Sequence, residues 1–250
     1  APFPEEINRK LTDSIADLYF APTKKAAENL TREGADTTKI IITGNTVIDA
    51  LMHTVKLLRE DEKQLQTVAS SFNMIDKDRR LILVTGHRRE NFGSGFKRIC
   101  AALRSIAKRG DVEIVYPVHL NPNVREPVIN ILSDTPNIHL IPPQDYLPFI
   151  YLMDRCDLVI TDSGGIQEEA PSLGKPVLVM RDVTERPEAV EAGTVKLVGT
   201  NTDIIVRETA LLLDDEAVYN SMSHSHNPYG DGKASNRIVK EIRRVHGLDD

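Results

Sequence analysis

The sequence predicts an α/β protein built around a doubly wound, Rossmann-like parallel sheet. From Arg80 onward, short apolar runs alternate with amphipathic stretches of helical spacing. The apolar runs are continuous rather than alternating, which is typical of strands that helices cover on both faces. Strand and helix in repeated alternation indicate parallel strands joined by helical crossovers.

The chain before this sheet holds fewer elements. Asp17–Ala21 and Lys39–Thr43 are predicted strands. Thr23 is the predicted N-cap of the helix between them, and Gly34 its stop. Apolar residues mostly three and four positions apart predict a further helix over Val47–Leu58.

The sheet itself is predicted to contain six strands. They are Leu81–Val84, Glu113–Tyr116, Ile138–Ile141, Leu158–Ile160, Val177–Met180 and Lys196–Val198. The helices between the strands are Gly95–Lys108, Val124–Leu132, Leu147–Cys156, Ile166–Leu173 and Pro187–Ala192, and those after the last strand are Asp203–Leu213, Glu216–Met222 and Ala234–Val245.

Composition narrows the function classes. The 250 residues are 40% hydrophobic and 27% charged, as in ordinary globular proteins. A net charge of −6 argues against sequence-independent binding of nucleic acid. No apolar run reaches the roughly 18 to 20 residues that cross a bilayer, so no membrane partner is expected. Cys100 and Cys156 lie in apolar stretches, and two buried thiols favour the cytoplasm.

Unusual polar residues follow five of the predicted strands. Ligands of open α/β sheets bind beyond the carboxyl ends of the strands, so these segments should share one edge and form a site there. The opposite ends carry ordinary charged turns such as Asp76–Arg80. The five segments are Thr85–Asn91, Pro117–Asn123, Pro142–Tyr146, Thr161–Glu169 and Arg181–Glu188.

The turn Ser163-Gly164-Gly165 opens a helix. Its glycines let a ligand approach the backbone, and the helix start offers free N–H groups to a phosphate or diphosphate. Glu168 or Glu169, one turn further, could accept hydrogen bonds from ribose hydroxyls. The alternative is a plain turn whose glycines permit close packing.

A strand order of 3-2-1-4-5-6 would place the His87 loop opposite the Ser163 turn. His87 and the following Arg88 and Arg89 would then bring cationic donors to an anion site, which favours ligand binding over a surface role.

Other residues of this edge leave two interpretations open. His119 is either a ligand residue or part of a turn in which Asn123 caps the next helix. Arg186 and Glu185 either contact a phosphate or sugar, or form a surface ion pair worth little. Tyr146 and Phe149 either flank a base or fill the core of a short helix.

Several familiar motifs are absent. His87–Glu90 lacks zincin spacing, and neither cysteine belongs to a CxxC pair. Gly93-Ser94-Gly95 lacks the last glycine of the dinucleotide fingerprint, and Ser163 lacks the preceding glycine of a nucleophile elbow. No P-loop is present. The sequence therefore predicts no metal and no nicotinamide cofactor.

Together these segments resemble a known family. The motifs are Pro2–Arg9, Thr43–Asp49, Thr85–Asn91, His119–Asn123, Asp162–Pro171 and Thr184–Glu188, in this order. Over its whole length the chain resembles the non-hydrolysing bacterial UDP-N-acetylglucosamine 2-epimerases.

The resemblance implies a glycosyltransferase-B-type fold of two domains with the active site between them. It implies interconversion of UDP-N-acetylglucosamine and UDP-N-acetylmannosamine for cell-surface polysaccharide synthesis. UDP would leave by anti elimination, giving 2-acetamidoglucal, and would add back after protonation of C2 from the other face. No cofactor takes part, and the family suggests a homodimer.

The resemblance also assigns roles to residues. Glu5 matches a catalytic carboxylate, and His87 an active-site histidine near the diphosphate. Arg88 and His119 match loops that bind a second, regulatory UDP-sugar. The UDP-binding set is His87, Phe149 near the uracil, Ser163, Gly164, Gly165, the ribose-binding Glu169 and Arg186.

Most of the family's N-terminal domain, including two catalytic acidic residues, has no counterpart here. The predicted organisation is a remnant of that domain in residues 1–43, a UDP-binding domain in 44–232 and a returning helix in 233–250. Such a chain is expected to bind UDP weakly without turnover, and its unpaired strand edges would favour aggregation. The alternatives are a hydrolysing epimerase, a non-catalytic UDP-sugar-binding module and a glycosyltransferase of similar fold.

Overall fold

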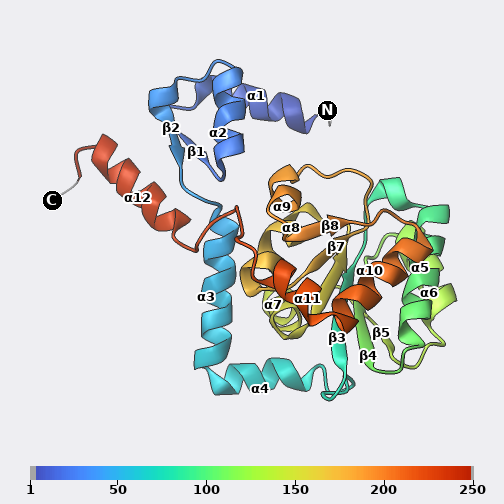
Figure 1. The fold of residues 1–250 in the computed structure, drawn as a ribbon. Helices are drawn as coiled ribbons and strands as arrows, with labels where there is room; N and C mark the ends of the chain where they lie inside the picture. The colour runs from blue at the N-terminus through green and yellow to red at the C-terminus, as the bar shows by residue number, and fades with distance from the viewer. Residues whose placement is uncertain (1–3, 249–250) are drawn as a thin grey trace. The chain divides into compact units, whose positions relative to one another are not determined.

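The computed structural model describes residues 4–248, so Pro2 and Phe3 of the first motif lie outside the described residues. The chain forms two compact units (Figure 1). One contains residues 1–52 and 228–250, and the other residues 53–227. The domain boundaries predicted after residues 43 and 232 stay a prediction.

The first unit is a small α/β unit. Its strands β1 (Tyr19–Ala21) and β2 (Ile40–Ile42) pair in parallel. As predicted, Thr23 caps the helix between them, because its hydroxyl accepts a 3.1 Å hydrogen bond from the Ala26 N–H. The other elements of this unit are α1 (Glu5–Ile15), α2 (Lys24–Arg32), the 3₁₀ turn η1 (Thr37–Lys39), the start of α3 (Thr46–Glu60) and α12 (Ala234–Val245).

The second unit contains the predicted doubly wound sheet. Within the described residues, six parallel strands follow the order β5-β4-β3-β6-β7-β8, which is the order expected from the sequence. This confirms the fold class. The strands are β3 (Arg80–Thr85), β4 (Val112–Pro117), β5 (Ile138–Ile141), β6 (Leu158–Thr161), β7 (Val177–Val179) and β8 (Val195–Leu197).

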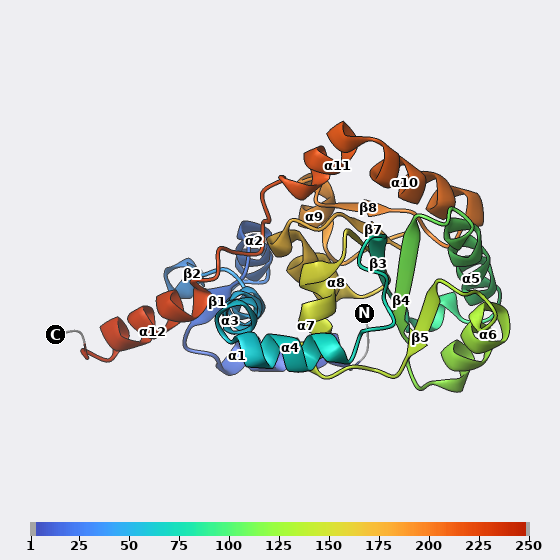
Figure 2. The same ribbon diagram turned by 90° about the horizontal axis from the view of Figure 1, so that it is seen from below.

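Helices cover both faces of this sheet. Figure 2 shows α5, α6 and α10 on one face and α7 and α8 on the other. The helices and 3₁₀ turns of this unit are α4 (Glu62–Ser70), η2 (Arg89–Asn91), α5 (Ser94–Ala107), α6 (Pro122–Leu132), α7 (Tyr146–Arg155), α8 (Gly164–Glu169), η3 (Ala170–Leu173), α9 (Pro187–Glu191), α10 (Thr202–Asp214) and α11 (Glu216–Ser223).

The main core lies between the sheet and α5, α6 and α10. Alternate strand residues such as Ile82 and Val84 face these helices and are fully buried. Cys100 and Cys156 are free and buried as predicted, and burial raises the pKa of each thiol to about 12. No helix within residues 4–248 combines the length and apolarity that a membrane crossing requires.

Candidate functional site

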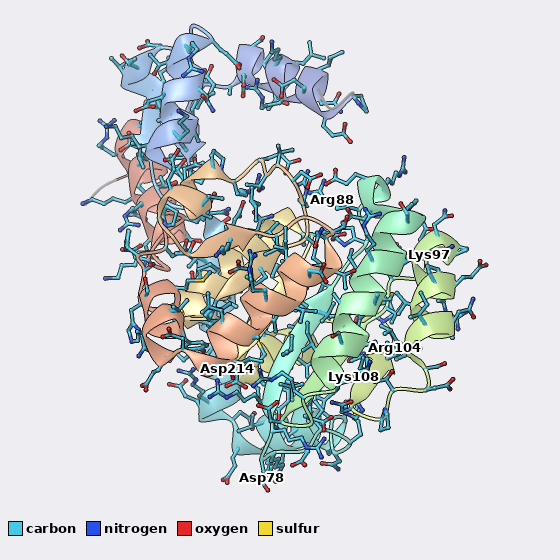
Figure 3. The ribbon with its side chains drawn as sticks, turned by 45° about the vertical axis from the view of Figure 1, so that its right-hand side comes forward. Asp78, Arg88, Lys97, Arg104, Lys108 and Asp214 are labelled. Atoms are coloured by element: carbon cyan, nitrogen blue, oxygen red, sulfur yellow. The ribbon has the colours of Figure 1, made fainter. Side chains whose placement is uncertain are left out.

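The switch point of the sheet lies between β3 and β6. Their ends meet at Thr85 and Thr161, whose hydroxyl oxygens are 2.6 Å apart. The His87 loop and the Ser163 turn leave these two ends, so the structure brings them together as predicted. Arg88 lies at this end of the second unit, and Asp78 at the opposite end (Figure 3).

Asp162 joins the two segments. Its carboxylate is fully buried and accepts hydrogen bonds from the backbone N–H groups of His87 (3.0 Å) and Arg88 (2.9 Å). Asn91 donates a further bond of 3.2 Å from its side chain. The Nδ1 atom of His87 lies 3.5 Å from the same carboxylate. Asp162 therefore fixes the backbone of the loop and orients the exposed imidazole.

His87 and His119 lie side by side, although they follow different strands. Their rings stack with centroids 5.7 Å apart. The Nδ1 atom of His119 accepts a 3.1 Å bond from the Asn121 N–H. Asn121 itself caps α6, so the prediction that Asn123 is the cap was wrong. The helix begins two residues earlier than expected, at Pro122, and Asn123 lies inside it.

Two guanidinium groups converge on Gly164. A methyl group added at this glycine would lie 3.6 Å from an Arg186 nitrogen and 3.7 Å from an Arg88 nitrogen. The Nε atom of Arg88 is buried and has no hydrogen-bond partner within the described residues. Arg186 pairs with the buried carboxylate of Glu168, so the surface-pair alternative does not describe it. This arrangement suits an anion seated on the Gly164 backbone.

Glu169 lies on the other side of the turn. One of its oxygens is 3.9 Å from the position that a Gly165 side chain would take, and the Ser163 hydroxyl is equally close to that position. Burial, followed by the neighbouring charge of Glu168, raises the pKa of Glu169 to about 7. The carboxyl group is therefore poised between its neutral and ionised forms near neutral pH.

Buried polar contacts tie the surrounding loops together. Arg181, just after β7, binds Glu90 (2.6 Å) and Glu185 (2.5 Å). Its hydrogen bond to Glu185 lowers the pKa of that carboxyl group to about 2. Gln167 accepts a 2.7 Å bond from Thr184. Of these residues, only Glu185 was considered in the sequence analysis, as a phosphate or sugar contact or a surface ion pair, and the roles of the others were missed. Their positions in the polar strand-end segments were the signal available.

The two remaining predicted site residues lie on α7 and α1. Phe149 is half-buried on α7, one turn after Tyr146. Glu5 is exposed at the start of α1, in the other unit. Among residues 4–248, no three His, Cys, Asp or Glu side chains are grouped so that they could hold a metal ion.

Comparison with known proteins shows the family of the chain. Residues 1–243 match the family model for UDP-N-acetylglucosamine 2-epimerase. The chain is 60% identical over 244 residues to a probable UDP-N-acetylglucosamine 2-epimerase of Ralstonia nicotianae, which covers 97% of this chain and 65% of that protein. It is 57% identical over 244 residues to the UDP-N-acetylglucosamine 2-epimerase of Escherichia coli K12, with the same coverage.

A solved structure agrees over nearly the whole chain. The crystal structure of UDP-GlcNAc 2-epimerase from Neisseria meningitidis, bound to UDP-GlcNAc, matches with a TM-score of 0.90 and 49% identity. The match covers 97% of this chain and 66% of the Neisseria chain. The present chain spans 65% of the length of the two curated relatives. On these matches, the chain belongs to the UDP-N-acetylglucosamine 2-epimerase family.

Proposed function

We propose that this chain provides the UDP-binding half of a UDP-N-acetylglucosamine 2-epimerase, which interconverts UDP-N-acetylglucosamine and UDP-N-acetylmannosamine. One observation carries the proposal: Arg88 and Arg186 converge on Gly164, while the carboxyl group of Glu169 lies beside Gly165. Cations and a carboxyl group on either side of one turn match the diphosphate and the ribose of a nucleotide sugar.

The proposed reaction begins with departure of UDP. Negative charge grows on the diphosphate as its bond to C1 breaks, and the two guanidinium groups would stabilise that charge. His87, oriented by Asp162, would assist there. Glu5 would act as one of the carboxylates that move the C2 proton, and loss of that proton together with UDP would give 2-acetamidoglucal. Protonation of C2 from the other face and return of UDP to C1 would then complete the epimerisation. Ser163 and Gly165 would complete the nucleotide site, with Phe149 against the uracil.

A second, regulatory UDP-sugar is proposed next to His119. The stack of His119 on His87 supports this role, because it links the loop after β4 directly to the active-site histidine. Arg88 lies close to Gly164 and would serve the first nucleotide as well. A homodimer and a role in polysaccharide precursor synthesis remain part of the proposal.

The nucleotide site is tested by calorimetric titration of the 250-residue chain with UDP. Gly164→Ala should weaken UDP binding at least 10-fold, because its methyl group would occupy the space that the phosphate needs. The fold should persist, since the nearest side-chain atoms are 3.6 Å from that methyl position. Gly95→Ala, at the start of α5, is the control and should bind UDP normally, because its methyl also meets ordinary contacts, at 3.5 Å.

The reaction is tested by incubation with UDP-N-acetylglucosamine. The proposal expects this chain alone to bind UDP without turnover, since it spans 65% of its relatives. Linked to the remaining third of such a relative, it should form UDP-N-acetylmannosamine. Free N-acetylmannosamine would instead indicate the hydrolysing alternative, and binding without any product would indicate a binding module.

A further inference from the structure

A contact between α7 and α8 gives Glu169 an unusual environment. The hydroxyl of Tyr146, the first residue of α7, lies 3.5 Å from one oxygen of the Glu169 carboxyl group. Tyr146 is 45% exposed, whereas Glu169 is 8% exposed. The hydroxyl of a partly exposed tyrosine therefore contacts a carboxyl group that is almost fully buried.

The second oxygen of Glu169 points elsewhere. It lies 3.9 Å from the side-chain position of Gly165, where an added methyl group would meet only ordinary contacts. A tyrosine hydroxyl can donate one hydrogen bond and accept another. Tyr146 can thus donate to Glu169 and accept from a ligand hydroxyl, while the second Glu169 oxygen accepts from a neighbouring hydroxyl. The pair has the geometry to read a vicinal diol.

We propose that Tyr146 is a positioning residue that turns Glu169 towards Gly165 and makes the site select ribonucleotides over 2′-deoxyribonucleotides. This inference rests on the proposed function and adds to it a residue that discriminates between sugars. Tyr146 and Phe149 lie three residues apart on α7 and so share a helix face, which places sugar and base recognition on one element.

The groups around Glu169 predict a pH dependence. Burial and the charge of Glu168, itself paired with Arg186, raise the pKa of Glu169 to about 7, and the Tyr146 hydroxyl opposes this shift. The ionised carboxylate accepts hydroxyl hydrogen bonds, so UDP affinity should rise as the pH rises through about 7. Removing the tyrosine hydroxyl should raise the pKa of Glu169, so the rise in UDP affinity should occur at higher pH.

The experiment compares UDP with 2′-deoxy-UDP between pH 6 and 8.5 by calorimetry. For Tyr146→Phe we expect roughly 10-fold weaker UDP binding at pH 7 and an almost unchanged affinity for 2′-deoxy-UDP. The midpoint of the rise in UDP affinity with pH should move to higher pH. Glu169→Gln should abolish the pH dependence. The matched control is Tyr151→Phe on the same helix, whose ring stacks on Phe72 with centroids 5.7 Å apart, and it should behave as the parent.

The outcomes separate two kinds of failure. If the parent chain binds UDP, but Tyr146→Phe keeps both its pH profile and its preference for UDP, the role of Tyr146 is overturned and the nucleotide site stands. If the folded parent chain binds neither nucleotide, the proposed function fails and the role of Tyr146 fails with it.

Discussion

Asp162 is the residue on which the geometry of the His87 loop depends. Its buried carboxylate accepts hydrogen bonds from two successive backbone N–H groups and from the Asn91 amide. An ionised carboxylate is acceptor-only, with about four lone-pair positions, whereas a carboxamide replaces one oxygen by an NH₂ donor. The carboxylate is therefore what allows one side chain to face several N–H groups at once.

Asp162→Asn should lower the free energy of unfolding by about 2–3 kcal/mol, because its NH₂ group would face N–H donors that then lack an acceptor. UDP affinity should fall as well, since the loop that carries Arg88 loses its anchor. Urea unfolding measures the first effect and calorimetry the second. Asp134→Asn, which changes an exposed carboxylate after α6, is the control. Equal stability of the two variants would contradict the anchoring role.

The sequence predicts a role for a residue only where the local motif indicates one. The glycines and helix start of the Ser163-Gly164-Gly165 turn, and the cationic residues of the His87 loop, indicate an anion site from the local sequence alone. Asp162 does not, because its donors at His87 and Asn91 lie 75 and 71 residues earlier in the chain. Arg186 remained ambiguous for the same reason, since the buried carboxylate that pairs with it lies on α8, a different element.

At the scale of elements, the C-terminal helix depends on a side chain from another helix. The N-cap residue of α12, Lys233, makes no capping hydrogen bond with its side chain. Instead, Asp49 on α3 accepts hydrogen bonds from the N–H groups of Ala234 (3.0 Å) and Ser235 (2.8 Å). Both contacts lie within the first unit. Asp49 thus supplies the cap and the negative charge that a helix N-terminus favours.

Asp49→Ala should therefore lower the free energy of local unfolding of α12 by about 1–2 kcal/mol, the usual cost of losing a helix cap. Hydrogen exchange of the α12 amides should become faster, while the amides of β3 to β8 keep their protection. Glu60→Ala, at the far end of α3, is the comparison variant, because its exposed pair with Lys56 is worth little. Unchanged exchange of α12 in Asp49→Ala would show that other contacts hold the helix.

Two helices escaped sequence analysis for identifiable reasons. In α4 Val68 is the one buried residue, so its pattern carries little apolar signal. In α1 the apolar residues Ile7, Leu11 and Ile15 recur every four positions, but each is at least half exposed. The strands of the sheet were predictable because burial on both faces demands continuous apolar runs. Their ends differ from prediction by a residue or so, where apolarity no longer decides.

At the scale of the whole molecule, the two units have very different cores. The large cluster between the sheet and its helices lies entirely in residues 53–227. In the other unit, the buried apolar side chains are few, namely Ala21, Ile48, Leu51, Tyr229 and Ala234 within the described residues. Stability grows with the apolar area that folding buries, so the unit of residues 1–52 and 228–250 should be much less stable than the unit of residues 53–227.

Unfolding should therefore occur in two steps, with residues 1–52 and 228–250 losing structure first. All the proposed UDP contacts lie in residues 53–227, so UDP should stabilise only this unit, which unfolds second. At a free UDP concentration of about 100 Kd, the free energy of unfolding of this unit should rise by about 2.7 kcal/mol. This corresponds to a rise of roughly 5–10 °C in its midpoint temperature. Hydrogen exchange measured at increasing temperature reports the unfolding of each unit separately. A single transition that UDP moves as a whole would mean that the units unfold as one cooperative body.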